Sequence, residues 1–436
     1  MSEILKLGAS GGRIDYAAAW FLKAAEYVEK YRARVGFVAT NSITQGEQVA
    51  QIWTAIFQRY RVEIAFAHRT FAWGSDARGK AHVHVVIVGL APRQHEPQIK
   101  RLFSYSNLNG DPEETTHSVL SPYLFDASQL SNRHLVVERV RTSLSGAPEI
   151  CVGSKPVDGG HYILDDQERV ELLRQEPDAY SLVRPYIGGR EFINGESRWI
   201  IYPEGLPASS IRKMPAVMER ITRVREFRKT STGNLANELA ETPTRFHVTV
   251  IPGAPFLAIP EVSSERREYV PIGWIEPPTI PSNQLLVILN ANLDLFAFMT
   301  SRMHMAWMRY IGGRLKSDYR YSSGIVYNTF PWPVANETQK AKVSELAQAV
   351  LDARVKYPQS TLADLYDPDT MPRDLRKAHR DLDLAVDKLY RAKAFQGDRD
   401  RVEHLFGQYE KLVAPLTAVG KLAKKARARI APGKKS

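Results

Sequence analysis

Residues 34–68, RVGFVATNSITQGEQVAQIWTAIFQRYRVEIAFAH, place a short apolar run on each side of an amphipathic segment. The two runs, 34–40 and 62–68, have the length and composition of buried strands. The spacing of apolar residues between them predicts a helix over 46–60, whose inner face is formed by Val49, Ile52, Trp53, Ile56 and Phe57. The order strand, helix, strand is typical of an α/β sheet.

The flanking sequence extends this pattern in both directions. Apolar residues at helical spacing predict a helix over 14–31, and residues 82–90, HVHVVIVGL, predict a further strand. The strands at 62–68 and 82–90 follow one another and are expected to pair like a hairpin. Together these segments form one edge of an α/β sheet, and the part that should precede it is missing.

The rest of the chain changes character three times. Prolines, glutamates and asparagines interrupt any periodicity over 92–120, which predicts a linker or an excursion of the chain. Short β-like runs, one helix and many prolines and glycines predict a mixed α+β domain up to residue 333. Three amphipathic segments within 334–420 predict a small helical bundle, and residues 421–436 form a basic tail.

Composition bounds the class of protein. The chain has 436 residues, 44% of them hydrophobic and 25% charged, as in ordinary globular proteins. The longest apolar stretches are too short to span a bilayer, and no secretory signal is visible, so we expect no membrane partner. The single cysteine, Cys151, excludes a disulfide framework and fits a reducing cytoplasm. The net charge of +11 is concentrated in the basic tail, which either nucleic-acid binding or plain disorder explains.

Motifs of several enzyme classes are absent. The sequence has no nucleophile elbow, no Walker loop and no HExxH pair. His82 and His84 share one face of a predicted strand, a spacing that can hold a metal. Without an acidic or cysteine partner nearby they are better read as ordinary sheet histidines, so we expect no metal site.

Several segments, taken in order, resemble one family. The early segments are GASGGRIDYAAAWFLKAA, FVATNSITQGEQVAQIW and FAHRTFAWGSDARGKAHVHVVIVGL. The later ones are DGGHYIL, RPYIGGREFINGESRW, IPEVSSERREYVPIGWI, TSRMHMAWMRYIGGRLKSDYRYSSGIVYNTFPWP and LADLYDPDTMPRDLRKAHRDLDLAVDKLY. Nearly the whole chain thus resembles the C-terminal half of the MmeI-like DNA methyltransferases, the Type IIL restriction–modification family of gamma-class adenine-N6 enzymes.

The resemblance implies a domain plan. Residues 1–91 are expected to be the C-terminal part of a Rossmann-like methyltransferase domain, and 92–333 a target-recognition domain. A helical bundle at 334–420 and the tail at 421–436 complete the plan. In the family, the complete enzyme transfers a methyl group from S-adenosylmethionine to an adenine in double-stranded DNA.

The chain departs from the family in what it lacks. The family needs a glycine-rich turn for S-adenosylmethionine and an Asn-Pro-Pro-aromatic loop for the adenine amino group. The glycines at 8–12 follow no strand, and Glu276-Pro277-Pro278-Thr279 lacks both the amide and the aromatic residue. The nuclease domain is also absent. We therefore expect a truncated gene product, an engineered piece or one subunit of a split enzyme, inactive without an upstream half supplied in trans.

The resemblance also assigns a base-stacking residue. In the gamma-class enzymes an aromatic side chain after the strand at 62–68 stacks on the extruded adenine, which makes Phe71 the candidate and Trp73 the second choice. The alternative is that both pack in the core. Asn41 and Ser42 end the strand at 34–40, where α/β sheets bind ligands, although capping of the next helix explains them equally well.

Residues 313–322, GRLKSDYRYS, gather opposite charges in a short run. In a strand, Lys316 and Asp318 would point to the same side, because side chains alternate with period two. The resemblance implies that this pair reads one base pair, with Arg314 and Arg320 on neighbouring bases or phosphates. The alternative is an exposed ion pair that contributes little to stability.

A second cationic candidate is the segment 212–229, which is expected to be helical. Arg225 and Lys229 lie on one face at a spacing of four residues, where they could contact phosphates. Pairing with Glu219 and Glu226 on a solvated helix explains the charges equally well.

The expected function is the DNA-binding and target-recognition portion of a site-specific DNA adenine-N6 methyltransferase. A stand-alone DNA-binding specificity module without catalysis is the alternative. Whether the chain itself acts as an enzyme is left open by the sequence.

Overall fold

The computed structural model describes residues 14–73 and 83–430. The chain forms two compact units, each discontinuous in sequence. Unit 1 comprises Met1–Ala147, Arg302–Ala335 and Asp387–Ser436, and unit 2 comprises Pro148–Ser301 and Asn336–Val386. The predicted boundaries at 91, 333 and 420 remain predictions about the sequence, because the units are defined by contacts in space.

Unit 1 is built on a sheet with flanking helices. Its helices are α2 (Ala18–Tyr31), α3 (Gln48–Gln58), α10 (Arg302–Ile311) and α14 (Asp398–Ile430), with short turns η2 (Asn41–Ile43), η3 (Arg93–His95) and η6 (Ser323–Tyr327). Its strands are β1 (Val35–Thr40), β2 (Val62–Trp73), β3 (Val83–Pro92), β4 (Lys100–Ser104), β5 (Glu113–His117), β15 (Gly313–Leu315) and β16 (Asp318–Arg320).

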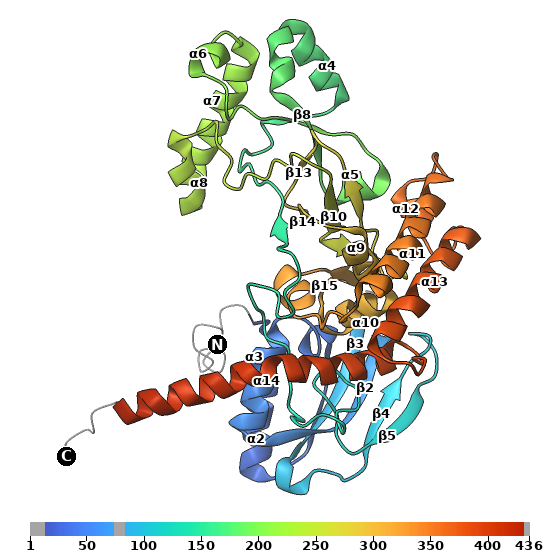
Figure 1. Cartoon of the computed structure of the whole chain (residues 1–436). Helices are drawn as coiled ribbons and strands as arrows, with labels where there is room; N and C mark the ends of the chain where they lie inside the picture. The colour runs from blue at the N-terminus through green and yellow to red at the C-terminus, as the bar shows by residue number, and fades with distance from the viewer. Residues whose placement is uncertain (1–13, 74–82, 431–436) are drawn as a thin grey trace, which may run out of the picture. The chain divides into compact units, whose positions relative to one another are not determined.

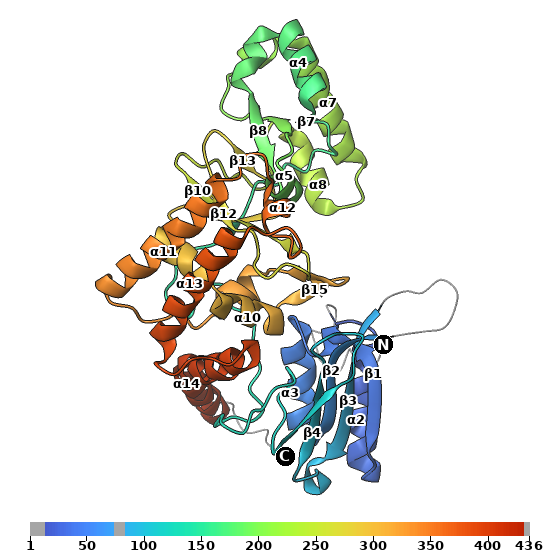
Figure 2. The ribbon, with the colours of Figure 1, turned by 90° about the vertical axis from the view of Figure 1, so that its right-hand side faces the viewer.

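The main sheet of unit 1 has five strands in the order β1-β3-β2-β4-β5. β3 runs antiparallel to both of its neighbours, so the predicted hairpin of the second and third strands is confirmed. β4 then pairs in parallel with β2, and β5 returns antiparallel. The helices α2 and α3 pack against each other and against this sheet (Figures 1 and 2).

The core of unit 1 lies between these helices and the sheet. Phe21 of α2 contacts Trp53 of α3 and Phe37 of β1 through its ring. Trp53 is fully buried, and its indole nitrogen donates to the Ile43 carbonyl at 2.7 Å. Such aromatic side chains bury a large apolar surface while their polar group stays hydrogen-bonded. They therefore hold the helices on the sheet.

Two expectations about this region were wrong. The segment 92–120 is not a linker, because β4 and β5 extend the sheet there. The alternating side chains of these two strands are partly charged or hydroxyl groups. Lys100 of β4 is buried, and its Nζ lies 2.5 Å from a carboxylate oxygen of Glu96. The second strand also continues to Trp73 rather than ending at residue 68. Hydrophobic pattern alone misses strands whose buried positions are polar.

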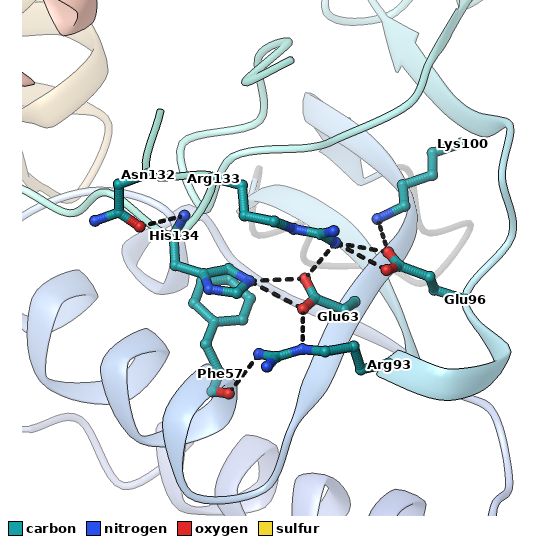
Figure 3. Close-up of polar contacts among 8 residues, drawn as sticks. All are labelled: Phe57, Glu63, Arg93, Glu96, Lys100, Asn132, Arg133 and His134. Atoms are coloured by element: carbon teal, nitrogen blue, oxygen red, sulfur yellow. Dashed lines mark hydrogen bonds and ion pairs between the residues drawn. The ribbon is translucent and has the colours of Figure 1, made fainter. Parts of the chain in front are cut away.

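A buried ionic cluster ties a distant loop segment to the sheet, as Figure 3 shows. Glu63 of β2 accepts from Arg93 at 2.7 Å and from the His134 ring at 2.9 Å, and Arg133 lies 3.0 Å away. Arg133 also donates to Glu96 at 2.7 Å. Burial by itself raises the pKa of Glu63, but the hydrogen bond and charge of His134, with the two arginines, lower it to about 2.

Unit 2 contains most of the short strands. They are β6 (Cys151–Val152), β7 (Ile163–Leu164), β8 (Val183–Ile187), β9 (Trp199–Ile201), β10 (Phe256–Pro260), β11 (Val262–Ser263), β12 (Gly273–Ile275), β13 (Ile280–Pro281) and β14 (Leu285–Ile288). Its helices are α4 (Asp166–Gln175), α5 (Gly189–Asn194), α6 (Ala208–Ile211), α7 (Pro215–Thr230), α8 (Asn234–Glu238), α9 (Leu293–Met299), α11 (Glu337–Val355), α12 (Leu362–Leu365) and most of α13 (Arg373–Tyr390), with turns η4 (Pro177–Ser181) and η5 (Leu239–Glu241).

Two four-stranded sheets organise unit 2, in the orders β12-β10-β14-β6 and β13-β8-β9-β7. The mixed α+β prediction is therefore confirmed. The three predicted C-terminal helices are present as α11, α13 and α14. α11 lies against α9 in unit 2, and α14 lies against α10 in unit 1.

Asn336 caps the start of α11, since its side chain accepts from the Gln339 amide at 2.9 Å. None of the helices in the described part of the chain combines the length and apolarity needed to cross a bilayer.

Candidate functional site

Aromatic side chains gather where β2 and β4 end. Phe71 of β2 stacks on Tyr105, with ring centroids 4.9 Å apart and planes at 22°. The Tyr105 hydroxyl lies 2.9 Å from Nδ1 of His68, whose ring stacks on Phe103 at 4.2 Å. Burial and then the charge of Arg101 lower the pKa of His68, which favours a neutral ring. The cluster is a half-buried aromatic platform.

Phe71 was expected to lie between two strands, and this expectation was wrong. Phe71 lies within β2, opposite Val85 of β3. A shift of register between His68 and Phe71 interrupts the pairing, and such irregularities re-aim side chains. Trp73 ends the strand 6.2 Å from Phe71 and is 45% exposed. Phe71 is half-buried and Trp73 is exposed, so neither belongs to the core. This disfavours the alternative that both side chains only pack in the core.

The segment 313–322 is a hairpin, which overturns the expectation of a single strand. β15 and β16 pair antiparallel, with Leu315 opposite Asp318. Lys316 therefore sits in the two-residue turn, with a left-handed φ of 58°, and is exposed. The period-two argument does not apply across a turn. The hairpin geometry nevertheless brings Lys316 and Asp318 to the same end, at the tip.

The hairpin is anchored to the loop that precedes α3. The Gln45 side chain donates to the Arg309 carbonyl at 3.0 Å and accepts from Nε of Arg314 at 3.2 Å. The Gly46 amide donates to the Ile311 carbonyl at 3.0 Å. A Cβ built on Gly46 would lie 3.4 Å from Cα of Gly313, so two glycines permit this close approach of backbones. All of these residues belong to unit 1.

The two hairpin arginines differ in their surroundings. The guanidinium of Arg314 lies 4.0 Å over the Tyr319 ring and donates to the Ser317 carbonyl at 2.7 Å. Arg314 therefore stabilises the hairpin itself, beyond any contact with a ligand. Arg320 is exposed at the end of β16.

The cationic helix candidate belongs to unit 2. Arg225 and Lys229 are exposed on α7, and Lys229 lies 3.5 Å from Glu226. Arg228 on the same helix is fully buried. Its guanidinium donates to five backbone carbonyls, those of Pro156, Val157, Leu239, Thr242 and Arg245, at 2.8–3.0 Å. Arg228 thus organises unit 2, and the helix is less cationic at its surface than its sequence indicates.

The structure places two of the remaining candidates, Asn41 and His84. Asn41 is buried, and its carbonyl accepts from both the amide and the hydroxyl of Thr44 at 3.0 Å, which closes a turn at the end of β1. His84 lies in β3 opposite Ala72, whereas His82 and the glycines at 8–12 lie outside the described residues. The residues that the structure describes contain no group of three or more potential metal ligands.

Sequence reasoning missed Gln45, Gly46 and Tyr105. Tyr105 lay in a segment read as a linker. Gln45 and Gly46 act across more than 260 residues of sequence, and no local pattern carries that information. The glycine before an amphipathic helix was the one available signal.

Three family models match this chain. The MmeI DNA-methyltransferase domain matches residues 1–104, the MmeI target recognition domain 131–334, and the MmeI C-terminal domain 334–417.

Two relatives agree with these matches. DNA methyltransferase A of Bacillus subtilis (strain 168) is 37% identical over 403 residues, which are 92% of this chain and 44% of that protein. The solved structure of the Type IIL restriction–modification enzyme MmeI in complex with DNA is 40% identical and has a TM-score of 0.86. It is matched over 95% of this chain and 55% of its own. This chain, which spans about half the length of these relatives, belongs to the MmeI family of Type IIL restriction–modification enzymes.

Proposed function

We propose that this chain is the DNA-binding and target-recognition part of a site-specific DNA adenine-N6 methyltransferase of a restriction–modification system. The anchored hairpin is the observation that carries the proposal. Its tip holds Lys316 and Asp318, and its base is fixed by Gln45 and Gly46 in the same unit as the Phe71 platform. A fixed relation between a base-reading tip and a base-stacking platform is what methylation at a defined site requires. The relative solved with DNA supports double-stranded DNA as the partner.

The tip has suitable chemistry for one G·C pair. A lysine donates to O6 or N7 of guanine, and an aspartate accepts from N4 of cytosine. Lys316 is exposed and Asp318 is half-buried, so both positions are near the surface of unit 1. Arg320, beside them, and Arg225 and Lys229 of unit 2 are assigned to phosphates or neighbouring bases.

The platform has suitable chemistry for an extruded adenine. Aromatic faces stack on bases that leave the duplex. Tyr105 covers one face of the Phe71 ring. The proposal assigns the adenine to the other face, with Trp73 at the rim.

The methyltransferase relatives imply S-adenosylmethionine as the methyl donor of a complete enzyme. The residues described here do not fit that cofactor by themselves. The end of β1, where an α/β sheet holds its ligand, is closed by the turn from Asn41 to Thr44. The Asn-Pro-Pro-aromatic sequence is also missing. We therefore derive no step through the cofactor and expect this chain alone to be inactive.

A surface of unit 1 supports a complementary methyltransferase segment as a partner, on the same chain or in trans. β1 pairs only with β3 in the described part of the sheet, so its other edge is open. Beside it, α2 exposes Trp20, Tyr27 and Tyr31, and Tyr16 lies in the turn that precedes this helix. Each of these four side chains is more than half exposed. A groove of about 450 Å³ runs between this aromatic row and Val35 and Phe37 of β1. Open strand edges and large apolar rows are features of interfaces.

The second candidate function is a DNA-binding specificity module without catalysis. The turn from Asn41 to Thr44 favours it, because this turn occupies the end of β1, where an α/β sheet would hold a ligand. The two candidates differ in one result. Adding a methyltransferase half from a relative should restore DNA methylation if the first holds, and should leave the DNA unmethylated if the second does.

The hairpin reading is tested by exchanging the charges at the tip. Combining Lys316→Glu with Asp318→Arg should reverse the preferred pair from G·C to C·G at one position of the site. We expect a loss of about 1–3 kcal/mol against the original base pair. Selection of bound duplexes from a randomised pool measures the preference. Uniformly weaker binding with an unchanged ranking of sites would show that the tip does not read bases.

A further inference from the structure

A polar cavity of about 330 Å³ lies within unit 1, between the platform and the hairpin. Its walls come from several elements of unit 1: the ends of β2 and β4, the loop at Tyr123 and Leu124, α10, the hairpin and the start of α14. Tyr105 lines the cavity and also stacks on Phe71, so the cavity and the platform share a wall. On the opposite side the cavity reaches Arg314 and Tyr319 of the hairpin.

Four arginines and one carboxylate line this cavity. The carboxylate, Asp398, accepts from Arg309 at 2.7 Å and from Arg302 at 2.9 Å, and both arginines hold its pKa below the usual range against the effect of burial. Arg399 donates to Glu403 at 2.9 Å. The negative charges at this wall are therefore already matched by arginines.

Arg69 differs from Arg309 and Arg399, which both pair with carboxylates. Its guanidinium lies over the ring of the buried Tyr310, 4.6 Å from the centroid. In 14–73 and 83–430, no carboxylate forms an ion pair with Arg69. Arg69 also forms a hydrogen bond with the Tyr310 side chain. A guanidinium has five N–H donors, so the others remain suited to bidentate contacts with phosphate.

The cavity also holds an unpaired hydroxyl group. Oγ of Ser104 is buried, lines this wall and has no hydrogen-bond partner in the part of the chain that the structure describes. Buried hydroxyls are normally paired, so an unpaired one at a cavity indicates a missing acceptor or water. Arg69 and Ser104 together present N–H and O–H donors to one polar space.

We propose that this cavity binds a phosphate group through Arg69 and Ser104. The source that the position favours is the DNA backbone beside the extruded nucleotide, since Arg69 precedes Phe71 by two residues on β2. Extruding a base rotates the backbone, and a phosphate clamp next to the stacking ring would hold the rotated form. This source rests on the proposed function, whereas phosphate binding by the cavity does not.

The test measures DNA affinity against salt concentration for three proteins: the unchanged chain, Arg69→Gln and Arg101→Gln. Arg101 is the matched control, because it lies on the same sheet, is exposed and pairs with Glu114 at 2.6 Å. Each phosphate contact contributes about 0.9 to the slope of log affinity against log salt. Arg69→Gln should lower the slope by about that amount, and Arg101→Gln should leave it unchanged. Arg69→Lys should restore most of the slope, and circular dichroism melting checks that each variant folds.

A second arm separates the two sources of phosphate. The melting temperatures of the same proteins are compared in millimolar pyrophosphate and in sodium chloride of equal ionic strength. Stabilisation by pyrophosphate that Arg69→Gln abolishes, with an unchanged DNA slope, assigns the cavity to a free phosphate ligand. No change in either arm overturns the inference. If the unchanged chain binds no DNA, the proposed function fails, and the pyrophosphate arm still decides on the cavity.

Discussion

At the scale of single residues, Lys316 combines an unfavourable conformation with an exposed charge. A left-handed φ costs a lysine roughly 1 kcal/mol relative to glycine, and such costs are frequent at functional positions. The turn carries a lysine at a position whose φ glycine would adopt at lower cost. This supports a role in binding over a role in folding.

We therefore predict opposite effects of Lys316→Gly on stability and on DNA binding. The variant should gain roughly 0.5–1 kcal/mol in the free energy of unfolding, because the strain is relieved, and should lose affinity for its DNA site. Urea denaturation and a binding titration measure the two quantities. Lys316→Ala is the control, because it removes the charge and keeps the strained φ. Equal stability of the two variants would show that the turn is not strained.

At the scale of elements, the Glu63 cluster joins β2 to the segment around Arg133 and His134 (Figure 3). The folded pKa of about 2 lies below the ordinary value of 4.5. A carboxylate with a lowered pKa stabilises the fold above its unfolded pKa and loses that contribution as the pH falls towards the folded value. The difference corresponds to roughly 3 kcal/mol.

Accordingly, the free energy of unfolding of the unchanged protein should fall between pH 4.5 and pH 2, and Glu63→Gln should remove much of that dependence. At pH 7 the variant should be less stable by roughly 2–3 kcal/mol, because two arginines lose their buried carboxylate. Denaturant melts across this pH range measure both effects. Glu114→Gln, at an exposed ion pair of the same sheet, is the control and should change little. If the free energy of unfolding fell equally with pH in the unchanged protein and in Glu63→Gln, groups other than Glu63 would cause the pH dependence.

At the scale of the whole molecule, the open edge of β1 and the aromatic row of α2 predict association with a methyltransferase half. Replacing both Trp20 and Tyr27 by serine should weaken that association by at least tenfold, because large aromatic side chains dominate interface energies. DNA binding by the chain itself should persist. Co-purification with the N-terminal half of a relative, followed by titration, measures the loss. Replacing Tyr180, an exposed aromatic residue of unit 2, by serine is the control. Unaltered association would mean that the row serves another partner.

The sequence alone determined the local elements and the family. The helices α2, α3, α7 and α11 and the strands β1 and β3 lie close to where apolar spacing predicts them. This is because burial of one face requires that spacing. Strands with polar buried positions, such as β4 and β5, escaped the same reasoning. The turn at Lys316 escaped it as well, because a charged decapeptide contains no hydrophobic pattern to fix its register.

Only the tertiary structure decided which distant residues share a site. It placed the 313–320 hairpin on the loop at Gln45 and Gly46, and it made Arg69, Ser104 and Tyr310 walls of one cavity. It also buried Arg228, which the sequence showed only as one more charge on a basic helix. These contacts join residues separated by tens to hundreds of positions. They follow from the packing of elements in three dimensions, and the period of a single helix or strand carries no record of them.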